Sequence, residues 1–175
     1  MTLDPEEIAR PANEFRSRPE FLRGRAAERL IAQRIREQGW NTVEASLFSG
    51  EDGDERPSLK GKFAELALPD LLIARAGQLR WVELKLKAKP ATDSVSGKQV
   101  HGVSARLVRE YLQVQEETGV MVFLAVFEED TRLLLVSRLD DLLTKGRLCA
   151  SDTLHLGGTW FFARDDFRHR WKIAG

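Results

Sequence analysis

Two acidic residues and one lysine stand where a hairpin would bring their side chains together. In the segment 80–88 apolar residues alternate with polar ones, so a β-strand puts Glu83 and Lys85 on one face. Thirteen residues before Glu83, Asp70 begins another strand-like segment, and a tight turn at 76–78 joins the two as a hairpin. Antiparallel pairing then brings Asp70 near the far end of the second strand.

Two carboxylates and an ammonium group in one place suit a particular chemistry. Carboxylate oxygens bind Mg²⁺, and a nearby lysine can stabilise an attacking hydroxide or the charge that develops at a phosphorus centre. The backbone carbonyl of Leu84 can add an oxygen ligand whatever its side chain. The group therefore indicates hydrolysis of phosphodiester bonds. The alternative is a half-buried strand with a solvated polar face, which is what an isolated Glu-x-Lys usually means.

A third carboxylate lies on the apolar side of a predicted helix. Glu28, Ile31 and Ile35 share one helical face, so this acid sits on an apolar stripe. An unpaired buried acid is costly, so Glu28 needs a cation or a hydrogen-bond donor as partner. The alternative is that Glu28 borders the stripe and pairs with Arg25 or Arg29 of its own helix.

The positions of these residues depend on helices and strands that the periodicity, caps and turns of the sequence predict. The all-apolar run 120–127 is typical of a strand buried on both faces at the centre of a sheet. The polar segment 88–102, which contains Pro and Gly, reads as a mobile connection. The order predicts an α/β fold with a central mixed β-sheet flanked by α-helices. The predicted helices are 19–38, 104–117 and 139–144, the last opened by a capping box at Ser137, and the predicted strands are 40–48, 70–75, 80–87, 120–127 and 132–136.

Composition limits the classes of protein that fit. The 175 residues predict one domain, with a lead-in at 1–18, a core at 19–145 and a C-terminal extension at 146–175. The 27 basic and 27 acidic side chains cancel, which argues against coating nucleic acid through bulk charge. The longest apolar run is too short to span a membrane, and no secretory signal is present. The lone Cys149 excludes a thiolate metal cluster and favours a reducing, cytoplasmic location.

The extension interleaves aromatic and basic residues from Trp160 to Lys172. Such a segment can stack on bases or grip phosphates. More often the aromatic rings cover a sheet edge while the cations stay in water, and we favour that interpretation here.

Together these segments resemble a known family. The stretches GRAAERLIAQRIREQGWNTV and LPDLLIARAGQLRWVELKLK are similar to the PD-(D/E)xK nuclease superfamily, especially its restriction endonucleases and its members like archaeal Holliday-junction resolvases. The resemblance covers about residues 22 to 127. The positions that carry it are Gly24 and Glu28 in the first helix, Gly39 and Trp40 at its end, Pro69 and Asp70, and Glu83 with Lys85.

The resemblance implies a restriction endonuclease-like core that cleaves DNA. By resemblance, Asp70, Glu83 and the Leu84 carbonyl would hold Mg²⁺ or Mn²⁺, and Lys85 would orient or activate water. Glu28 would support that metal or a second one. Since many relatives cut two strands through two-fold symmetry, a homodimer is one option.

One part of the sequence departs from the family pattern. Many relatives carry a serine or glutamine at the start of the helix after the catalytic strands, and here Gln99 and Ser104 are the candidates. His101 is an accessory candidate as an acid or a phosphate contact, although a single histidine in a polar loop is more often merely exposed. This departure leaves the substrate subclass open.

The sequence thus predicts a metal-dependent DNA endonuclease. A neutral chain without an added sequence-reading module favours cleavage directed by DNA structure or assisted by a partner. One alternative is a non-cleaving nucleic-acid- or protein-binding module that keeps the fold. Another alternative is a small-molecule α/β enzyme in which the motif occurs by chance. A deep apolar pocket away from Glu83 would favour this alternative.

Overall fold

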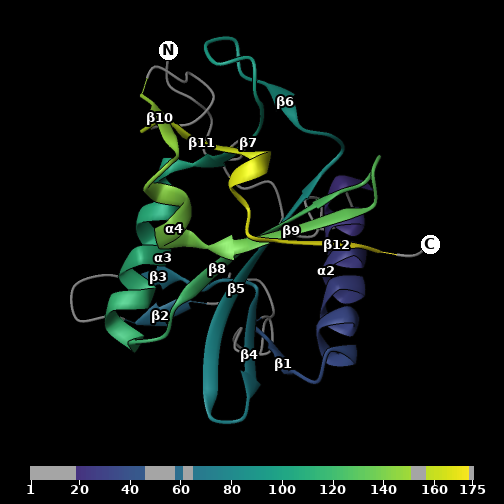
Figure 1. Cartoon of the computed structure of the whole chain (residues 1–175). Helices are drawn as coiled ribbons and strands as arrows, with labels where there is room; N and C mark the ends of the chain where they lie inside the picture. The colour runs from purple at the N-terminus through teal and green to yellow at the C-terminus, as the bar shows by residue number, and fades with distance from the viewer. Residues whose placement is uncertain (1–18, 46–57, 61–64, 151–156, 174–175) are drawn as a thin grey trace, which may run out of the picture.

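A computed structural model describes residues 19–45, 58–60, 65–150 and 157–173 (Figure 1). The predicted lead-in 1–18 lies outside the described residues. No described helix has both the length and the apolar character needed to cross a membrane.

The centre of the fold is a mixed six-stranded sheet in the order β1-β4-β5-β8-β9-β12. Only β5 and β8 in this sheet pair parallel; their neighbours pair antiparallel. The predicted α/β fold with a mixed sheet is therefore confirmed. The strands of this sheet are β1 (Asn41–Glu44), β4 (Leu71–Arg75), β5 (Gln78–Lys87), β8 (Val122–Glu128), β9 (Leu133–Arg138) and β12 (His169–Lys172).

Helices cover both faces of this sheet (Figure 1). On one face lies α2 (Pro19–Glu37), which packs Ala27, Ile31 and Ala32 against the sheet. On the other lie α3 (Ala105–Thr118) and α4 (Leu139–Leu143). Since side chains alternate along a strand, the four central strands β4, β5, β8 and β9 contribute to two separate apolar cores, one under each layer of helices.

The hairpin that carries the catalytic candidates forms as predicted. β4 and β5 pair antiparallel from Leu71 with Val82 to Arg75 with Gln78. The two residues between them, Ala76 and Gly77, both have positive φ (49° and 77°). Such a turn matches the twist of the strands that it joins.

The segment 88–102 is not the mobile connection that the sequence predicts. It contains β6 (Ala91–Thr92) and most of β7 (Gln99–Ser104), which belong to a second sheet of four strands in the order β10-β11-β7-β6. β7 is hard to tell from a loop in the sequence, because it is largely polar, contains glycine and pairs with β11, which is far away along the chain. The remaining strands are β10 (Arg147–Cys149), β11 (Thr159–Ala163) and the separate pair β2 (Ser58–Lys60) and β3 (Glu65–Ala67).

The C-terminal segment belongs to both main sheets. After β11 and a short 3₁₀ helix, η3 (Arg164–Asp166), β12 pairs with β9 and forms an edge of the central sheet. Its aromatic residues do not cover a sheet edge as predicted: Trp171 lies within the edge strand β12, Trp160 and Phe161 lie in β11, and Phe162 and Phe167 enter the core. The predicted capping box is wrong: Arg138, not Ser137, precedes α4, and no side chain caps that helix.

Candidate active site

The β4–β5 register sets Asp70 opposite Glu83. Leu71 pairs with Val82, so Asp70, one residue earlier, faces Glu83, one residue later, across the hairpin. The backbone N–H of Leu84 donates a hydrogen bond to Oδ2 of Asp70 at 2.7 Å. The hairpin therefore brings Asp70 and Glu83 to the same place and fixes one Asp70 oxygen by a main-chain contact.

Glu83 and Lys85 lie on one face of β5, as the alternation predicts. Their strand neighbours across the parallel pair are Leu124 and Val126, both in the core beneath α3. The Lys85 ammonium contacts Oε1 of Glu83. The Glu83 side chain is 2% exposed, and its second oxygen, Oε2, is buried with no hydrogen-bond partner among the described residues.

Burial and like charge act together on Asp70. Burial raises the pKa of Asp70 well above its ordinary value of 3.8, and the neighbouring Glu83 carboxylate raises it further. Lys85 and the Leu84 N–H offset part of this rise, while Glu28 adds to it. Clustered carboxylates that disfavour their own ionisation are a frequent mark of a functional site.

Glu28 takes part in this cluster while also bonding within its own helix. Arg25 donates a hydrogen bond to Oε2 of Glu28 at 2.7 Å, which is the pairing considered as the alternative from sequence. Burial raises the pKa of Glu28 against the effect of Arg25, and the carboxylates of Glu83 and Glu44 add to the rise. Glu28 thus interacts electrostatically with Glu83, and Arg25 partly balances its negative charge.

A divalent cation fits these residues. Asp70 and Glu83 supply hard oxygen donors, and an unpartnered buried carboxylate oxygen such as Oε2 of Glu83 calls for a cation. Over the described residues, no set of three or more His, Cys, Asp or Glu side chains is arranged to hold a metal ion. A cation here would therefore rest on two carboxylates, with main-chain oxygen and water completing its coordination.

The accessory candidates lie in β7, which belongs to the second sheet, whereas Glu83 lies in the central sheet. Gln99 is exposed and donates a hydrogen bond to Thr92 at 3.0 Å. His101 is 2% exposed, so the expectation of an exposed histidine in a loop is wrong. Its Nε2 lies 2.9 Å from Oε1 of Glu128 at the end of β8. Ser104 precedes α3 without capping it through its side chain.

Sequence reasoning missed Glu128 and Arg164. Glu128 follows the apolar run of β8 and is fully buried, and Arg164 binds it through two hydrogen bonds. A charged residue that directly ends an all-apolar strand is the signal that could have drawn attention to Glu128. Nothing local marks Arg164, which lies 36 residues further along the chain.

The opposite face of the sheet carries a pocket of about 470 Å³ between α2 and β12. Its floor is apolar. At its edge the guanidinium groups of Arg75 and Arg80 stand over the Trp40 ring, 4.4 and 4.6 Å from its centre. The pocket lining, as far as the described residues define it, contains no Ser, Thr or Cys, and its one acid, Glu37, is paired with Arg34 at 2.6 Å. Its other polar lining residues, His169 and Lys172 among them, come mostly from β12 and from the arginines around Trp40.

Among the comparisons with known proteins, a solved structure supports the fold. No protein-family profile and no curated protein sequence matches the chain. Among solved structures, Hjc, a Holliday junction resolvase from the archaeal hyperthermophile Archaeoglobus fulgidus, is similar with a TM-score of 0.53 at 11% identity, over 87% of this chain and 93% of Hjc.

Two further solved structures are similar at lower scores. A nuclease from a fusselovirus has a TM-score of 0.45 at 11% identity, over 97% of this chain and 90% of its own. The bacterial homing endonuclease I-Ssp6803I has a TM-score of 0.38 at 16% identity, over 77% and 81%. The mixed sheet, the antiparallel hairpin and the similarity to Hjc lead to one conclusion: the chain has a restriction endonuclease-like fold.

Proposed function

We propose that the chain is a metal-dependent DNA endonuclease that hydrolyses phosphodiester bonds. The observation that carries the proposal is the position of Asp70 opposite Glu83, with Lys85 on the same face and Oε2 of Glu83 buried without a partner. The fold shared with a Holliday junction resolvase supports it. Magnesium or manganese would be held by Asp70, Glu83 and the carbonyl of Leu84.

Each residue has a distinct task in this proposal. A divalent cation bound there would supply Lewis-acid activation of water and of the phosphate. The backbone N–H of Leu84 keeps one oxygen of Asp70 in place. Lys85, anchored against Glu83, presents its ammonium where negative charge develops on the phosphate oxygens. Glu28, braced by Arg25, adds negative charge that favours cation binding.

The substrate proposal follows from charge and composition. The chain is neutral overall, so we propose cleavage directed by DNA structure, with a second copy of the chain acting on the other strand. The alternative of a non-cleaving binding module keeps the same fold but requires no metal. The small-molecule alternative rests on the pocket beside Trp40, whose lining over the described residues holds no Ser, Thr or Cys and one acid, Glu37, which is paired with Arg34.

Two substitutions separate the tasks of the acid and the lysine. Lys85→Ala should keep most Mn²⁺ binding yet lose about a hundredfold in cleavage rate, because an ammonium group is not a metal ligand but stabilises the transition state. Glu83→Ala should lose both, since it removes a ligand and a negative charge. Lys145→Ala, at an exposed site after α4, is the matched control.

The measurements are calorimetric titration with Mn²⁺ and cleavage of branched, single-stranded and duplex DNA. Equal loss of Mn²⁺ affinity in both variants would overturn the division of tasks. DNA binding by the intact protein without cleavage in Mg²⁺ or Mn²⁺ would favour the binding module, and cleavage without any metal would overturn the mechanism.

A further inference from the structure

A second lysine follows the catalytic candidate on the same face of β5. Side chains alternate along a strand, so Lys87 lies on the side of Glu83 and Lys85 and is the last residue of the strand. It is half-buried. None of the described residues is hydrogen-bonded to or ion-paired with its ammonium group, in contrast to Lys85, which contacts Glu83.

The residue best placed to neutralise Lys87 is Glu128. The two are direct neighbours in the parallel pairing of β5 and β8, and the shared register puts both side chains on the same face. An opposite charge across neighbouring strands ordinarily gives a favourable pair. Here that pair does not form.

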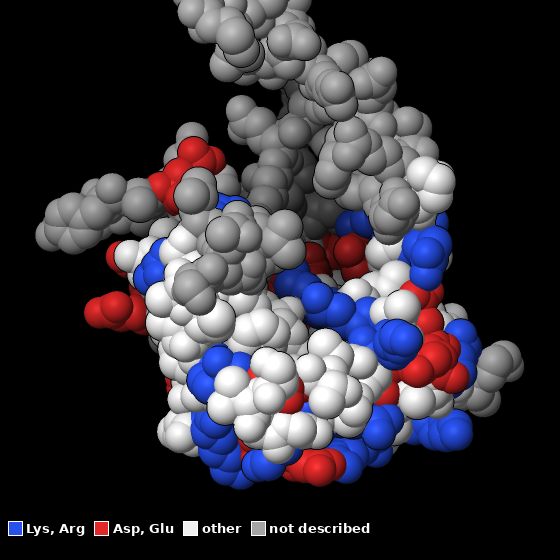
Figure 2. All heavy atoms as spheres, turned by 90° about the horizontal axis from the view of Figure 1, so that it is seen from above, with Lys and Arg blue, Asp and Glu red and all other residues white. Residues whose placement is uncertain are grey.

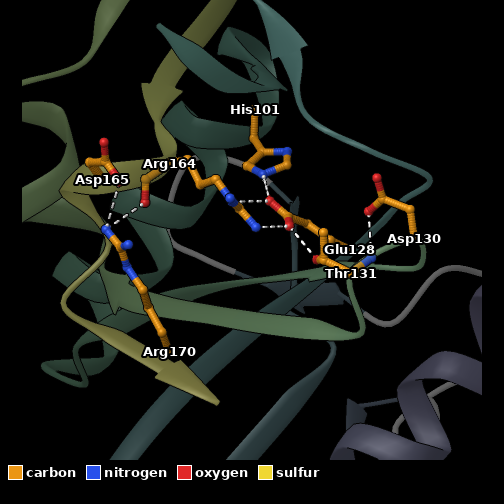
Figure 3. Close-up of polar contacts among 7 residues, drawn as sticks. All are labelled: His101, Glu128, Asp130, Thr131, Arg164, Asp165 and Arg170. Atoms are coloured by element: carbon orange, nitrogen blue, oxygen red, sulfur yellow. Dashed lines mark hydrogen bonds and ion pairs between the residues drawn. The ribbon is translucent and has the colours of Figure 1, made fainter. Parts of the chain in front are cut away.

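Glu128 is occupied by other donors (Figure 3). Its Oε1 accepts hydrogen bonds from Nε of Arg164 at 2.9 Å and from Nε2 of His101 at 2.9 Å. Its Oε2 accepts from Nη2 of Arg164 at 2.7 Å and from Oγ1 of Thr131 at 2.6 Å. Each carboxylate oxygen therefore has two donors, and the negative charge is balanced by the bidentate Arg164 guanidinium.

Among the described residues nothing compensates the charge of Lys87, whose surroundings are partly desolvated. Burial lowers the pKa of Lys87, and the neighbouring Lys85 lowers it further. Holding two lysines side by side without a second acid costs free energy in the free protein. Binding of an anion from solution would offset that unfavourable free energy.

Basic side chains also gather on the face of the molecule that is seen from above in Figure 2. Figure 2 shows basic side chains running across the middle of that face, with acidic side chains beside them. A local band of this kind provides phosphate contacts even though the chain as a whole is neutral.

We propose that Lys87 is a positioning residue that binds the DNA phosphate next to the one being cleaved, and that Arg164 and His101 keep it available by occupying Glu128. The inference rests on the proposed function. Residues two apart on a strand are separated by roughly 6.6 Å, which is similar to the spacing of successive phosphates along one nucleic-acid strand. Lys85 and Lys87 therefore match two neighbouring phosphates of the same strand.

Substitution of Lys87 separates binding from chemistry. Lys87→Met should weaken DNA binding and raise KM about tenfold, because a charge-assisted contact is lost, while kcat stays within a factor of about two. Lys87→Arg, which keeps the charge, should restore most of the affinity. The slope of log affinity against log salt concentration should fall by about one phosphate contact. Lys145→Met, with the same charge change after α4, should leave all three quantities unchanged.

A change in the DNA tests the position of the contact. Once the cut site is mapped, a neutral methylphosphonate is placed at the phosphate on either side of it, and binding is measured in Ca²⁺. One of these two substitutions should weaken binding to the wild type about tenfold and have no further effect on Lys87→Met. If both substitutions weaken the variant as much as the wild type, the proposed contact is wrong.

The remaining outcomes are equally decisive. A Lys87→Met protein with wild-type affinity and salt slope overturns the inference, as does one with reduced kcat and unchanged KM. Melting temperatures, together with the Lys87→Arg protein, identify a loss of binding that comes from misfolding. If the wild type binds DNA without cutting it, the proposed function fails, while the salt slope of Lys87→Met still decides whether Lys87 contacts a phosphate.

Discussion

On the face of the sheet that packs against α3, β5 presents Glu83, Lys85 and Lys87, whereas on the face toward α2 its intervening residues Val82 and Leu84 are apolar and buried. On the charged face the Glu83 carboxylate adds to the raised pKa of Asp70, and Lys87 has no acid partner among the described residues. The opposite face packs a helix and leaves a pocket. Because side chains alternate along β5, one face of the strand carries the candidate catalytic residues and the other face packs in the core. Substitutions at neighbouring positions should therefore affect different properties, cleavage on one face and folding stability on the other.

The largest effect on stability should come from Leu84→Ala. Leu84 lies between Glu83 and Lys85 in sequence, but its side chain is 7% exposed in the core beneath α2. Truncation should lower the free energy of unfolding by about 3 kcal/mol. Cleavage at a temperature where the variant is folded should stay within a few-fold of wild type, since the backbone groups of Leu84 remain. Urea unfolding and a cleavage assay measure both. A hundredfold loss of cleavage in the folded variant would show that the two faces are not independent.

A smaller effect of opposite sign should come from Asp70→Asn. Because folding raises the pKa of Asp70, the stability that its neutral form provides below about pH 3.8 is lost as the pH rises. The amide stays neutral, so the metal-free variant should be about 1 kcal/mol more stable than wild type at pH 7. The gain should vanish below pH 3.8.

The same variant gives a test of metal binding. Mn²⁺ should raise the melting temperature of the wild type, because it binds only the folded state, but not that of Asp70→Asn. Thermal unfolding at several pH values, with and without Mn²⁺, is the measurement. A variant that is less stable than wild type at pH 7 would contradict the charge repulsion deduced for this site.

The smallest effect should come from Arg80→Gln on the pocket side. Arg80 stands over Trp40 and Phe123, but burial and the nearby Arg75 both lower the pKa of its guanidinium. The loss of stacking and the relief of repulsion should nearly cancel, leaving the free energy of unfolding within about 0.5 kcal/mol of wild type. Cleavage should not change. Urea unfolding followed by tryptophan fluorescence tests the first point, and reduced cleavage would mean that this face also contacts DNA.

The central hairpin could be predicted from the sequence because its signals are local. Alternation in 80–88, the turn at Gly77 and the Asp70 that opens the first strand all lie within twenty residues. These signals were enough to place Asp70, Glu83 and Lys85 together. The apolar run ending at Phe127 likewise marked the centre of the sheet.

The surroundings of the hairpin could not be predicted in the same way. His101 looked exposed because its neighbours in sequence are polar, yet it is buried by Glu128, 27 residues away, and by Phe167. The bond from Arg25 to Glu28 is local, but whether Glu28 also reaches Glu83 depends on how α2 packs on the sheet. Burial of polar groups is decided by tertiary partners, which periodicity does not reveal.

The bidentate contact between Arg164 and Glu128 also has a consequence for the order of folding. During synthesis from the N-terminus, β8 is complete long before Arg164 leaves the ribosome. Until then Glu128 lacks the guanidinium that balances its charge, and closing the core around it would bury an unpaired carboxylate. We therefore expect this end of the sheet to close only when the last part of the chain is present, so that one ion pair couples the core of the sheet to the C-terminal segment.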